Sequence, residues 1–407
     1  MRVLVLGAGI QGVCAALALR QRGHHITLID RMPDLMLRTS LRNEGKIHLG
    51  FVYANDASFQ TSALLLRAAL KFSPLLDEWL EMQVDWRTMI STPFVYLVAR
   101  DSMLSAEKLY AHYARLQDDF NEITAAGHDA FYLGNDLRGK MLWQRADPKI
   151  DRWFSAKHAA DCIETVELAL DREKFRTLLR ARLASFPEIE TRFGHSIETL
   201  ERTAQGFRVQ GTRADGTPWH ASAETVVNCL WDGRLVFDQQ LGIAPACAFV
   251  MRLKYRVVGE LAPAFAGLPS FTMVLGRYGD IVVYPNAPSY FSWYPACMRG
   301  WSQTIAPPVE WDAACVGNAP REISEHVARE TLAAFDEIVP GIKSSRVGLV
   351  DAGVIYSRGA TDIDDYASAL HRRYEIGFSA HDGYYSVDTG KFTCAPFFAE
   401  QLALQMG

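Results

Sequence analysis

No run of about eighteen apolar residues occurs in this sequence, and no long tract of one charge marks a tail. The first absence predicts a protein without a membrane span. The second, together with a formal net charge of −5, gives no reason to expect a nucleic-acid partner. The 407 residues are 49% hydrophobic and 22% charged, which is ordinary for a globular protein long enough for two domains.

Cysteine is scarce as well, and the chain contains no CxxC pair. An odd number of dispersed cysteines argues against a disulfide framework, and the missing pairs argue against a zinc site, so we predict no metal. Reduced thiols are typical of the cytoplasm, where we expect the protein to be. The seven cysteines are Cys14, Cys162, Cys229, Cys247, Cys297, Cys315 and Cys394.

Residues 1–30 read MRVLVLGAGIQGVCAALALRQRGHHITLID. We predict a short buried strand over residues 3–6, a helix over 14–21 and a second strand over 26–29, which together form a βαβ unit. A secretory leader needs an uninterrupted apolar centre, whereas glycines interrupt this one. The stretch is therefore expected to be folded structure and not a cleaved leader.

Gly7, Gly9 and Gly12 match the GxGxxG pattern between the first predicted strand and the helix. In dinucleotide-binding folds the first glycine permits a tight turn, the second lets a pyrophosphate approach the backbone, and the third lets the helix pack on the strand. The helix N-terminus then offers amide donors to the phosphates. Asp30, at the end of the second strand, is expected to bind ribose hydroxyls, and we include the adjacent Arg31 in the predicted dinucleotide site.

The glycine pattern alone fits both FAD and NAD, and residues 39–56, TSLRNEGKIHLGFVYAND, favour FAD. Here the chain resembles the D-amino-acid oxidase/glycine oxidase superfamily of FAD-dependent oxidoreductases, whose members carry a polar segment along the pyrophosphate and under the flavin. The IHLG of residues 47–50 is similar to the IHAG or IHGG of L-2-hydroxyglutarate and glycerol-3-phosphate dehydrogenases. The residues that match the polar segment are Thr39, Ser40, Asn43 and Gly45.

Two later stretches extend the resemblance. VVNCLWDGR, residues 226–234, falls where the family has a buried strand ending in VVNAAG, and the resemblance places Ile197 beside the adenine. FSAHDGYYSVDTGKFTCAPFFAEQLA, residues 378–403, is similar to the family's last flavin-contacting loop and helix. The resemblance places near the isoalloxazine ring Gly383, Thr389, Gly390, Lys391 and Thr393. Small residues of the family are replaced here by Trp231, Asp232, Tyr384 and Tyr385.

The resemblance implies an α/β fold in which a Rossmann-like FAD-binding domain is interleaved with a mixed-sheet α+β substrate domain. We assign residues 1–60, 151–245 and 346–407 to the FAD-binding domain and residues 61–150 and 246–345 to the substrate domain. The sequence contains no second GxGxxG, so we expect electrons to come from a small-molecule substrate and not from a nicotinamide. They then pass to oxygen or to a carrier, and the sequence leaves both alternatives open.

Two residues are candidates for contact with the substrate. Residues 278–294, YGDIVVYPNAPSYFSWY, predict two strands joined by a turn and resemble the family hairpin that carries a substrate-facing tyrosine, which makes Tyr284 the first candidate. Arg358 aligns with the arginine that binds the substrate carboxylate in amino-acid oxidases, a task that suits its planar guanidinium. The alternatives are an ordinary sheet aromatic for Tyr284 and, for Arg358, a surface residue paired with Asp362 or Asp364.

His48 and Lys391 are further candidates. His48 is interpreted as a base that takes a hydroxyl proton, as the attachment point of a covalent flavin, or as a residue that only hydrogen-bonds the cofactor. We expect FAD to be bound non-covalently, with a covalent link through His48 as the alternative. Lys391 is expected to place positive charge near flavin N1 and the C2 carbonyl, where it favours reduction, and the alternative is a solvated lysine at the start of the last helix.

These residues predict an FAD-dependent oxidase or dehydrogenase that oxidises the CH–NH bond of a small polar amine or amino acid by hydride transfer to flavin N5. Arg358 and Tyr284 favour the amine. IHLG and Lys391 favour the alternative, which is oxidation of the CH–OH group of a 2-hydroxy acid or polyol phosphate. A third interpretation is a flavin-binding scaffold without turnover, and the aromatic-rich insertions argue against it because a scaffold does not need a lined cavity.

Overall fold

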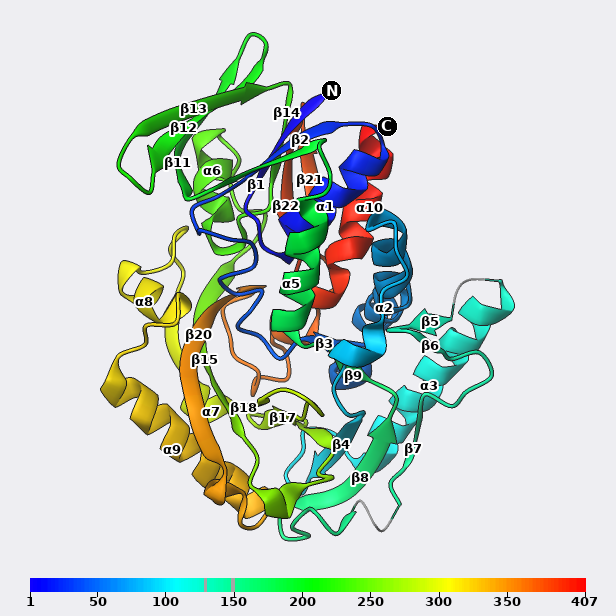
Figure 1. The fold of residues 1–407 in the computed structure, drawn as a ribbon. Helices are drawn as coiled ribbons and strands as arrows, with labels where there is room; N and C mark the ends of the chain where they lie inside the picture. Colours follow the sequence, from blue (N-terminus) through cyan, green and yellow to red (C-terminus); the bar gives the residue numbers. More distant parts are fainter. Residues whose placement is uncertain (128–129, 148–150) are drawn as a thin grey trace.

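The computed structural model describes residues 1–127, 130–147 and 151–407, and both termini lie at the same end of the molecule (Figure 1). At that end is a six-stranded sheet in the order β10-β2-β1-β14-β22-β21, in which β21 runs antiparallel to β22 and the other neighbouring pairs are parallel. Its strands are β1 Arg2–Leu6, β2 His25–Asp30, β10 Ile189–Phe193, β14 Thr225–Asn228, β21 Gly377–His381 and β22 Tyr384–Asp388.

Helix α1 (Ile10–Gln21) follows β1 directly and packs on the six-stranded sheet, α10 (Ala395–Met406) and α2 (Gln60–Trp79). Every residue of α1 from Ile10 to Leu19 is buried, because the helix is apolar on all sides and such a helix is stable only inside a core. The predicted βαβ unit is therefore present, and the predicted α/β fold class is confirmed.

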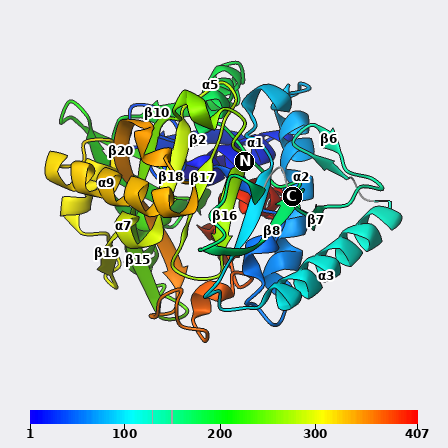
Figure 2. The same cartoon turned by 90° about the horizontal axis from the view of Figure 1, so that it is seen from below.

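The second large sheet has nine strands and is mixed (Figure 1). Its order is β19-β15-β18-β17-β16-β4-β8-β7, with β20 also paired to β15; β16 and β4 are parallel. Seen from below, α9 (Arg321–Ile338) and α3 (Ala106–Ala125) lie at opposite ends of this sheet (Figure 2). The strands are β4 Phe94–Ala99, β7 Trp143–Arg145, β8 Ala159–Thr165, β15 Phe249–Glu260, β16 Ser270–Val274, β17 Gly279–Val282, β18 Ser289–Trp293, β19 Met298–Ser302 and β20 Arg346–Arg358.

Three small sheets and several short helices complete the described fold. The small sheets are β11–β12–β13 (His195–Thr203, Gly206–Arg213, Pro218–Ala223), β3–β9 (Lys46–Ile47, Leu168–Ala169) and β5–β6 (Phe131–Tyr132, Asn135–Asp136). The other helices are α5 Arg172–Leu183, α6 Arg234–Gln240, α7 Tyr294–Cys297 and α8 Asp312–Cys315.

Three elements pack in another layer than the one to which their predicted domain range assigns them. β8 and β20 pair within the nine-stranded sheet, although both fall in ranges assigned to the FAD-binding domain. α2 falls in a range assigned to the substrate domain, yet it packs on α1 and α10 beside the six-stranded sheet. The physical reason is that long-range strand pairing and helix packing decide which layer a segment joins, and neither is visible in a local pattern.

Within the described ranges, none of the helices combines the length and apolar character needed to cross a membrane. The same residues contain no group of three or more His, Cys, Asp or Glu side chains arranged to hold a metal ion. All seven cysteines are free thiols, and six of them are buried. Packing and hydrogen bonding, and not covalent cross-links, therefore hold the chain together.

A buried histidine of α3 gives the fold a testable acid sensitivity. The Nε2 atom of His112 lies 3.2 Å from Ser62 Oγ and 3.3 Å from Gly50 O. Burial lowers the pKa of His112 from 6.5 to about 4. Between these two pH values the unfolded chain binds a proton at this histidine and the native state does not. Stability from this residue is full above the unfolded pKa and falls by about 3 kcal/mol as the pH drops toward the folded pKa.

We therefore expect His112→Gln to flatten the fall in the urea unfolding midpoint between pH 6.5 and pH 4. Parallel midpoint curves for the variant and the parent protein would contradict this prediction.

Candidate active site

A cavity of about 600 Å³ is lined by residues from both large sheets and from the loops between them. Its volume lies in the range of about 300–1,000 Å³ that is usual for small-molecule sites. The cavity is the natural place for cofactor and substrate, because it meets the first βα turn on one side and strands β15, β18 and β20 on the other. Its wall takes residues from segments 7–11, 30–48, 229–237, 306–312, 353–355 and 389–392.

The glycines of the first βα turn leave no room for side chains. A Cβ on Gly7, whose φ is +94°, would lie 2.7 Å from the Cys229 carbonyl oxygen. A Cβ on Gly12 would lie 1.7 Å from the Gly7 carbonyl oxygen, so α1 packs against the turn only because residue 12 is glycine. Gly7 and Gly9 line the cavity, and their backbone is open to a ligand there.

Asp30 and Ser40 tie this turn to its surroundings. Asp30 Oδ2 accepts a hydrogen bond from the Ala8 N–H at 2.6 Å, and Asp30 Oδ1 accepts one from the Met32 N–H at 2.8 Å. The hydroxyl of Ser40 accepts a hydrogen bond from the Ile10 N–H at 2.9 Å. Burial raises the pKa of Asp30, and the two backbone hydrogen bonds oppose that rise. The carboxylate is thus fixed at the cavity wall with lone pairs left for ribose hydroxyls.

We expect Asp30→Ala to reduce the FAD content of the purified protein, since it removes the carboxylate at the predicted ribose position and leaves the Ala8 N–H without its partner. The ratio of flavin absorbance to protein absorbance measures the effect. Asp34→Ala is the matched control, because the Asp34 carboxylate pairs with Arg176 and Arg180 outside the cavity. Full FAD occupancy in Asp30→Ala would disprove the ribose assignment.

The polar segment after β2 forms a turn that is fastened to strand β20. The Thr39 hydroxyl donates to the Val354 carbonyl and accepts from the Val354 N–H, each at 3.2 Å. The Asn43 amide nitrogen donates to Thr39 O at 2.9 Å, and the Asn43 amide oxygen accepts from the Gly45 N–H at 2.7 Å. The segment is thereby held as a rigid part of the cavity wall.

Arg31 lines the cavity beside Asp30, and its guanidinium is paired with Asp312 at 2.8 Å. Asp312 also accepts from Arg38 at 2.6 Å, and Arg38 lies 3.3 Å from Asp232. These ion pairs connect the end of β2 to the short helix α8. They explain why Asp232 stands at a position where the resembling family has a small residue.

Glu44 brings negative charge to the cavity. Burial disfavours its ionised form, but His48 and the ammonium groups of Lys254 and Lys391 outweigh burial and hold the pKa of Glu44 well below its ordinary range. Glu44 is therefore a carboxylate at neutral pH, with 21% of its side chain exposed. It can bind a cationic group or accept a proton from one.

Two positively charged side chains, Lys254 and Arg373, line the same cavity. Burial alone would lower the pKa of Lys254 on β15, but Tyr290, Asp280 and Glu44 outweigh burial and raise it. In the part of the chain that the structure describes, no hydrogen bond or ion pair reaches the Lys254 ammonium, and the buried Nε of Arg373 has no hydrogen-bond partner. Both groups line the cavity and can bind an anion.

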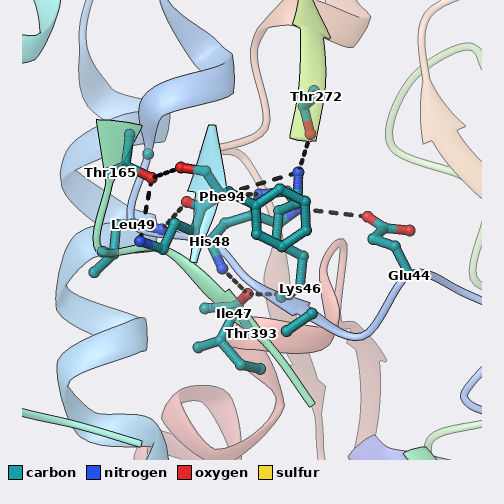
Figure 3. A network of polar contacts seen from close by, with 12 residues as sticks. Glu44, Lys46, Ile47, His48, Leu49, Phe94, Thr165, Thr272 and Thr393 are labelled. Carbon is teal, nitrogen blue, oxygen red and sulfur yellow. Dashed lines mark hydrogen bonds and ion pairs between the residues drawn. The ribbon is translucent and has the colours of Figure 1, made fainter. Parts of the chain in front are cut away.

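His48 lies between the carboxylate of Glu44, which Figure 3 shows beside it, and the carboxylate of Glu167. Its Nε2 is 3.5 Å from Glu44 Oε1 and its Nδ1 is 3.7 Å from Glu167 Oε1, and neither contact has hydrogen-bond geometry. The His48 N–H donates to the Thr393 hydroxyl at 2.9 Å, which fixes the backbone of this residue. The ring lines the cavity but is only 5% exposed.

The cavity brings together most of the residues predicted from the sequence. Those that line it are Gly7, Gly9, Asp30, Arg31, Thr39, Ser40, Asn43, His48, Ile197, Thr389, Gly390 and Lys391. Four others support the wall from behind or lie farther away: Gly12 packs α1 on the turn, Gly45 lies against Leu170, Thr393 accepts from His48, and Gly383 lies in the turn between β21 and β22.

Tyr284 does not line the cavity. Its hydroxyl contacts the Leu170 and Glu44 carbonyl oxygens at 2.9 and 3.1 Å, and Arg172 Nη1 at 3.1 Å. These contacts use the phenol as a structural cross-link, and burial raises its pKa to about 12. The cavity-lining phenol of the predicted hairpin is instead Tyr290, which is on β18.

Arg358 also lies outside the cavity lining. Its side chain is 31% exposed and pairs with Glu375 at 3.3 Å, and not with Asp362 or Asp364. β20 ends at Arg358, beyond the residues 353–355 that reach the cavity wall. The prediction that Arg358 faces the substrate therefore differs from the position of its side chain in the structure.

Several charged or phenolic residues that line the cavity were not singled out by the sequence, among them Glu44, Lys254, Tyr290 and Arg373. Glu44 lies within the polar segment of residues 39–56, and its charge at that place in the sequence is a signal that could have identified it. Lys254 shares strand β15 with two other basic residues, Arg252 and Arg256, so its charge alone did not mark it as a cavity residue.

Residues 2–403 match the DAO family, described as FAD dependent oxidoreductase. The chain belongs to this family. Because the match covers almost the whole chain, it identifies the protein as an FAD-dependent oxidoreductase. The predicted superfamily is thereby confirmed.

Sequence similarity to a relative of this DAO family member covers only a short part of the chain. A D-amino acid dehydrogenase of Cereibacter sphaeroides is 38% identical over 76 residues, which are 19% of this chain and 17% of that protein. The matched part is thus under a fifth of the relative's length.

Solved structures extend the likeness to the whole fold. A glycine oxidase from Geobacillus kaustophilus has a TM-score of 0.66 at 11% identity, over 99% of this chain and 94% of that one. A glycerol-3-phosphate dehydrogenase from Bacillus halodurans complexed with FAD has a TM-score of 0.55 at 16% identity, over 100% and 64%. At these identities the likeness is one of fold.

The residues of the cavity fit FAD. The backbone of the turn with Gly7 and Gly9 lines the cavity without side chains, as the approach of a pyrophosphate requires. Asp30 keeps a carboxylate for the ribose, and Ile197 and the loop from Thr389 to Lys391 lie on the same cavity. We expect these groups to hold the cofactor.

Proposed function

We propose that this DAO family member oxidises the carbon–nitrogen bond of a small polar amine or amino acid. When bound, FAD supplies the two-electron acceptor. The chain itself binds and orients the substrate, excludes water and removes a proton. The substrate assignment rests on the charges of the cavity wall.

The observation that carries the proposal is the pair of opposite charges, Glu44 and Lys254, on one cavity. Each lies close enough to the other to affect its pKa. An amino acid carries an ammonium and a carboxylate, and it can satisfy both wall charges at once. Lys391 and Arg373 add positive charge that suits the carboxylate. A substrate with an alcohol in place of the ammonium would offer no cationic group to Glu44.

Oxidation of a 2-hydroxy acid is the second candidate, and His48 is the observation that favours it. An alcohol must lose its hydroxyl proton to a base, and His48 lies behind Glu44 on the cavity wall. The same positive charges would bind the acid or a phosphate. The two candidates therefore share an anion site and differ in the group that faces Glu44.

Anaerobic bleaching of the visible flavin absorbance tests the proposal. The panel contains amino acids and amines on one side and the matching 2-hydroxy acids and polyol phosphates on the other. We expect an amino acid to bleach the flavin faster than the hydroxy acid with the same side chain. Bleaching by hydroxy acids alone would reject the proposal in favour of the second candidate, and no bleaching by either would reject both.

A further inference from the structure

A line of ionisable side chains leads from the cavity into the core. Glu44 is partly exposed at the cavity, His48 is 5% exposed behind it, and Glu167 is 0% exposed behind the ring. The separations are 3.5 Å from Glu44 Oε1 to His48 Nε2 and 3.7 Å from His48 Nδ1 to Glu167 Oε1. Catalytic contacts are often this long before substrate binds and shorten in the complex.

The fold holds Glu167 firmly in this place. Strands β3 and β9 pair Lys46 with Ala169 and Ile47 with Leu168, and this pairing brings the residue before β9 beside the residue after β3. One oxygen of Glu167 accepts from the Leu49 N–H at 2.6 Å, and the other accepts from the Tyr96 hydroxyl at 2.5 Å. The carboxylate cannot turn away from the ring without breaking these bonds.

Charged groups surround the His48 ring. Two carboxylates, Glu44 and Glu167, face it, while the ammonium of Lys46 lies 3.9 Å from Glu167 and donates to the Thr272 hydroxyl at 2.5 Å. Asp280 also interacts electrostatically with the ring, and Tyr53 lies against it edge-on. Accepting a proton therefore places a positive imidazolium between two negative groups, which stabilises it.

We propose that Glu44, His48 and Glu167 form a proton relay for substrate oxidation, with Glu167 as the residue that orients His48 and stabilises its charged form. This inference rests on the proposed function. The ammonium of the substrate cannot assist oxidation of the neighbouring carbon until it has a free lone pair, so one N–H bond must break first. The proton moves to a Glu44 oxygen, and then that O–H bond breaks as an Nε2–H bond forms on His48.

The order of the relay follows from the two acceptors. Glu44 is a carboxylate whose pKa is held well below its ordinary range, so it receives a proton only briefly. In this relay His48 holds the proton next, with its Nε2 facing Glu44 and its Nδ1 facing Glu167. Glu167 touches neither cavity nor substrate, and it acts only through the ring. For the alternative hydroxy acid, the same relay would take the O–H proton.

Glu167→Gln removes the negative charge of the side chain but keeps its shape, and it therefore tests the relay. The rate of anaerobic flavin reduction by the substrate found in the bleaching panel is measured against pH. We expect a fall of about 100-fold at neutral pH, the lower end of what a general base contributes, with a smaller deficit at high pH where the substrate deprotonates unaided. Asp77→Asn is the matched control, because this carboxylate accepts from Val84 and Trp86 outside the cavity. An unchanged rate and pH profile in Glu167→Gln would overturn the proposal.

A second measurement does not need turnover. Selective ¹⁵N labelling of histidine, with the His48 signals assigned by their loss in His48→Gln, reports which ring nitrogen carries the proton in the FAD-loaded protein. We expect Nδ1–H in the parent and a redistribution toward Nε2–H in Glu167→Gln. An Nε2–H tautomer in the parent would overturn the relay. If no compound of the panel reduces the flavin, the proposed function fails, and this tautomer alone then decides whether the arrangement exists.

Discussion

Lys254→Met is expected to raise KM for a carboxylated substrate by about 100-fold while kcat changes little. The Lys254 ammonium lines the cavity, and no partner among the described residues neutralises it directly, so a substrate carboxylate is its natural partner. A 100-fold loss corresponds to about 2.7 kcal/mol, which is typical of a charge-assisted hydrogen bond in a partly buried site. Because the anion is bound in the ground state and the transition state alike, the loss falls on KM.

Arg358→Ala is the matched control for that experiment. Its guanidinium pairs with Glu375 outside the cavity, so we expect KM to remain at the parent value. Lys254→Arg keeps the charge and is expected to recover part of the affinity. The reverse pattern, with a normal KM in Lys254→Met and a raised KM in Arg358→Ala, would show that the resemblance located the carboxylate site better than the cavity geometry does.

Gly12→Ala is expected to abolish FAD binding. Its Cβ would lie 1.7 Å from the Gly7 carbonyl oxygen, and residues 7 and 12 both pack on Cys229, which directly follows strand β14. Either α1 moves away from the turn or the turn opens, and both changes withdraw the backbone groups that face a pyrophosphate. The measurement is the flavin absorbance of the purified protein, with circular dichroism to establish that the chain is folded.

Gly348→Ala is the control for the glycine substitution itself. A Cβ at Gly348 meets only the Val258 carbonyl oxygen at 3.4 Å, which is an ordinary contact on β20. We expect this variant to bind FAD like the parent protein. A folded Gly12→Ala protein with full FAD content would contradict the assigned role of the first βα turn.

The parts of the fold that depend on local pattern could be predicted from the sequence. The βαβ unit with Gly7, Gly9 and Gly12 is encoded within residues 1–30, since strand, turn and helix each leave a short-range signal. The long helix α9 and the hairpin of β17 and β18 have the same kind of signal in periodicity and turn residues. The family resemblance then supplied the cofactor and the second domain.

The direction of individual side chains could not be predicted in the same way. The hairpin was predicted, yet Tyr290 and not Tyr284 reaches the cavity, because the register that pairs Tyr290 with Val282 and Val258 decides which phenol faces inward. Glu167 meets His48 only through the two-residue pairing of β3 with β9. Such long-range register leaves no local trace, so the charged part of the site had to come from the structure.

We expect the protein to remove electrons from a carbon–nitrogen bond. To test this, the FAD-loaded protein is reduced anaerobically with the amino acid that bleaches it best, and the nitrogen released is assayed. We expect one equivalent of ammonia or amine, together with the carbonyl product, for each flavin reduced. Complete flavin reduction without released nitrogen, or reduction by 2-hydroxy acids alone, would contradict it.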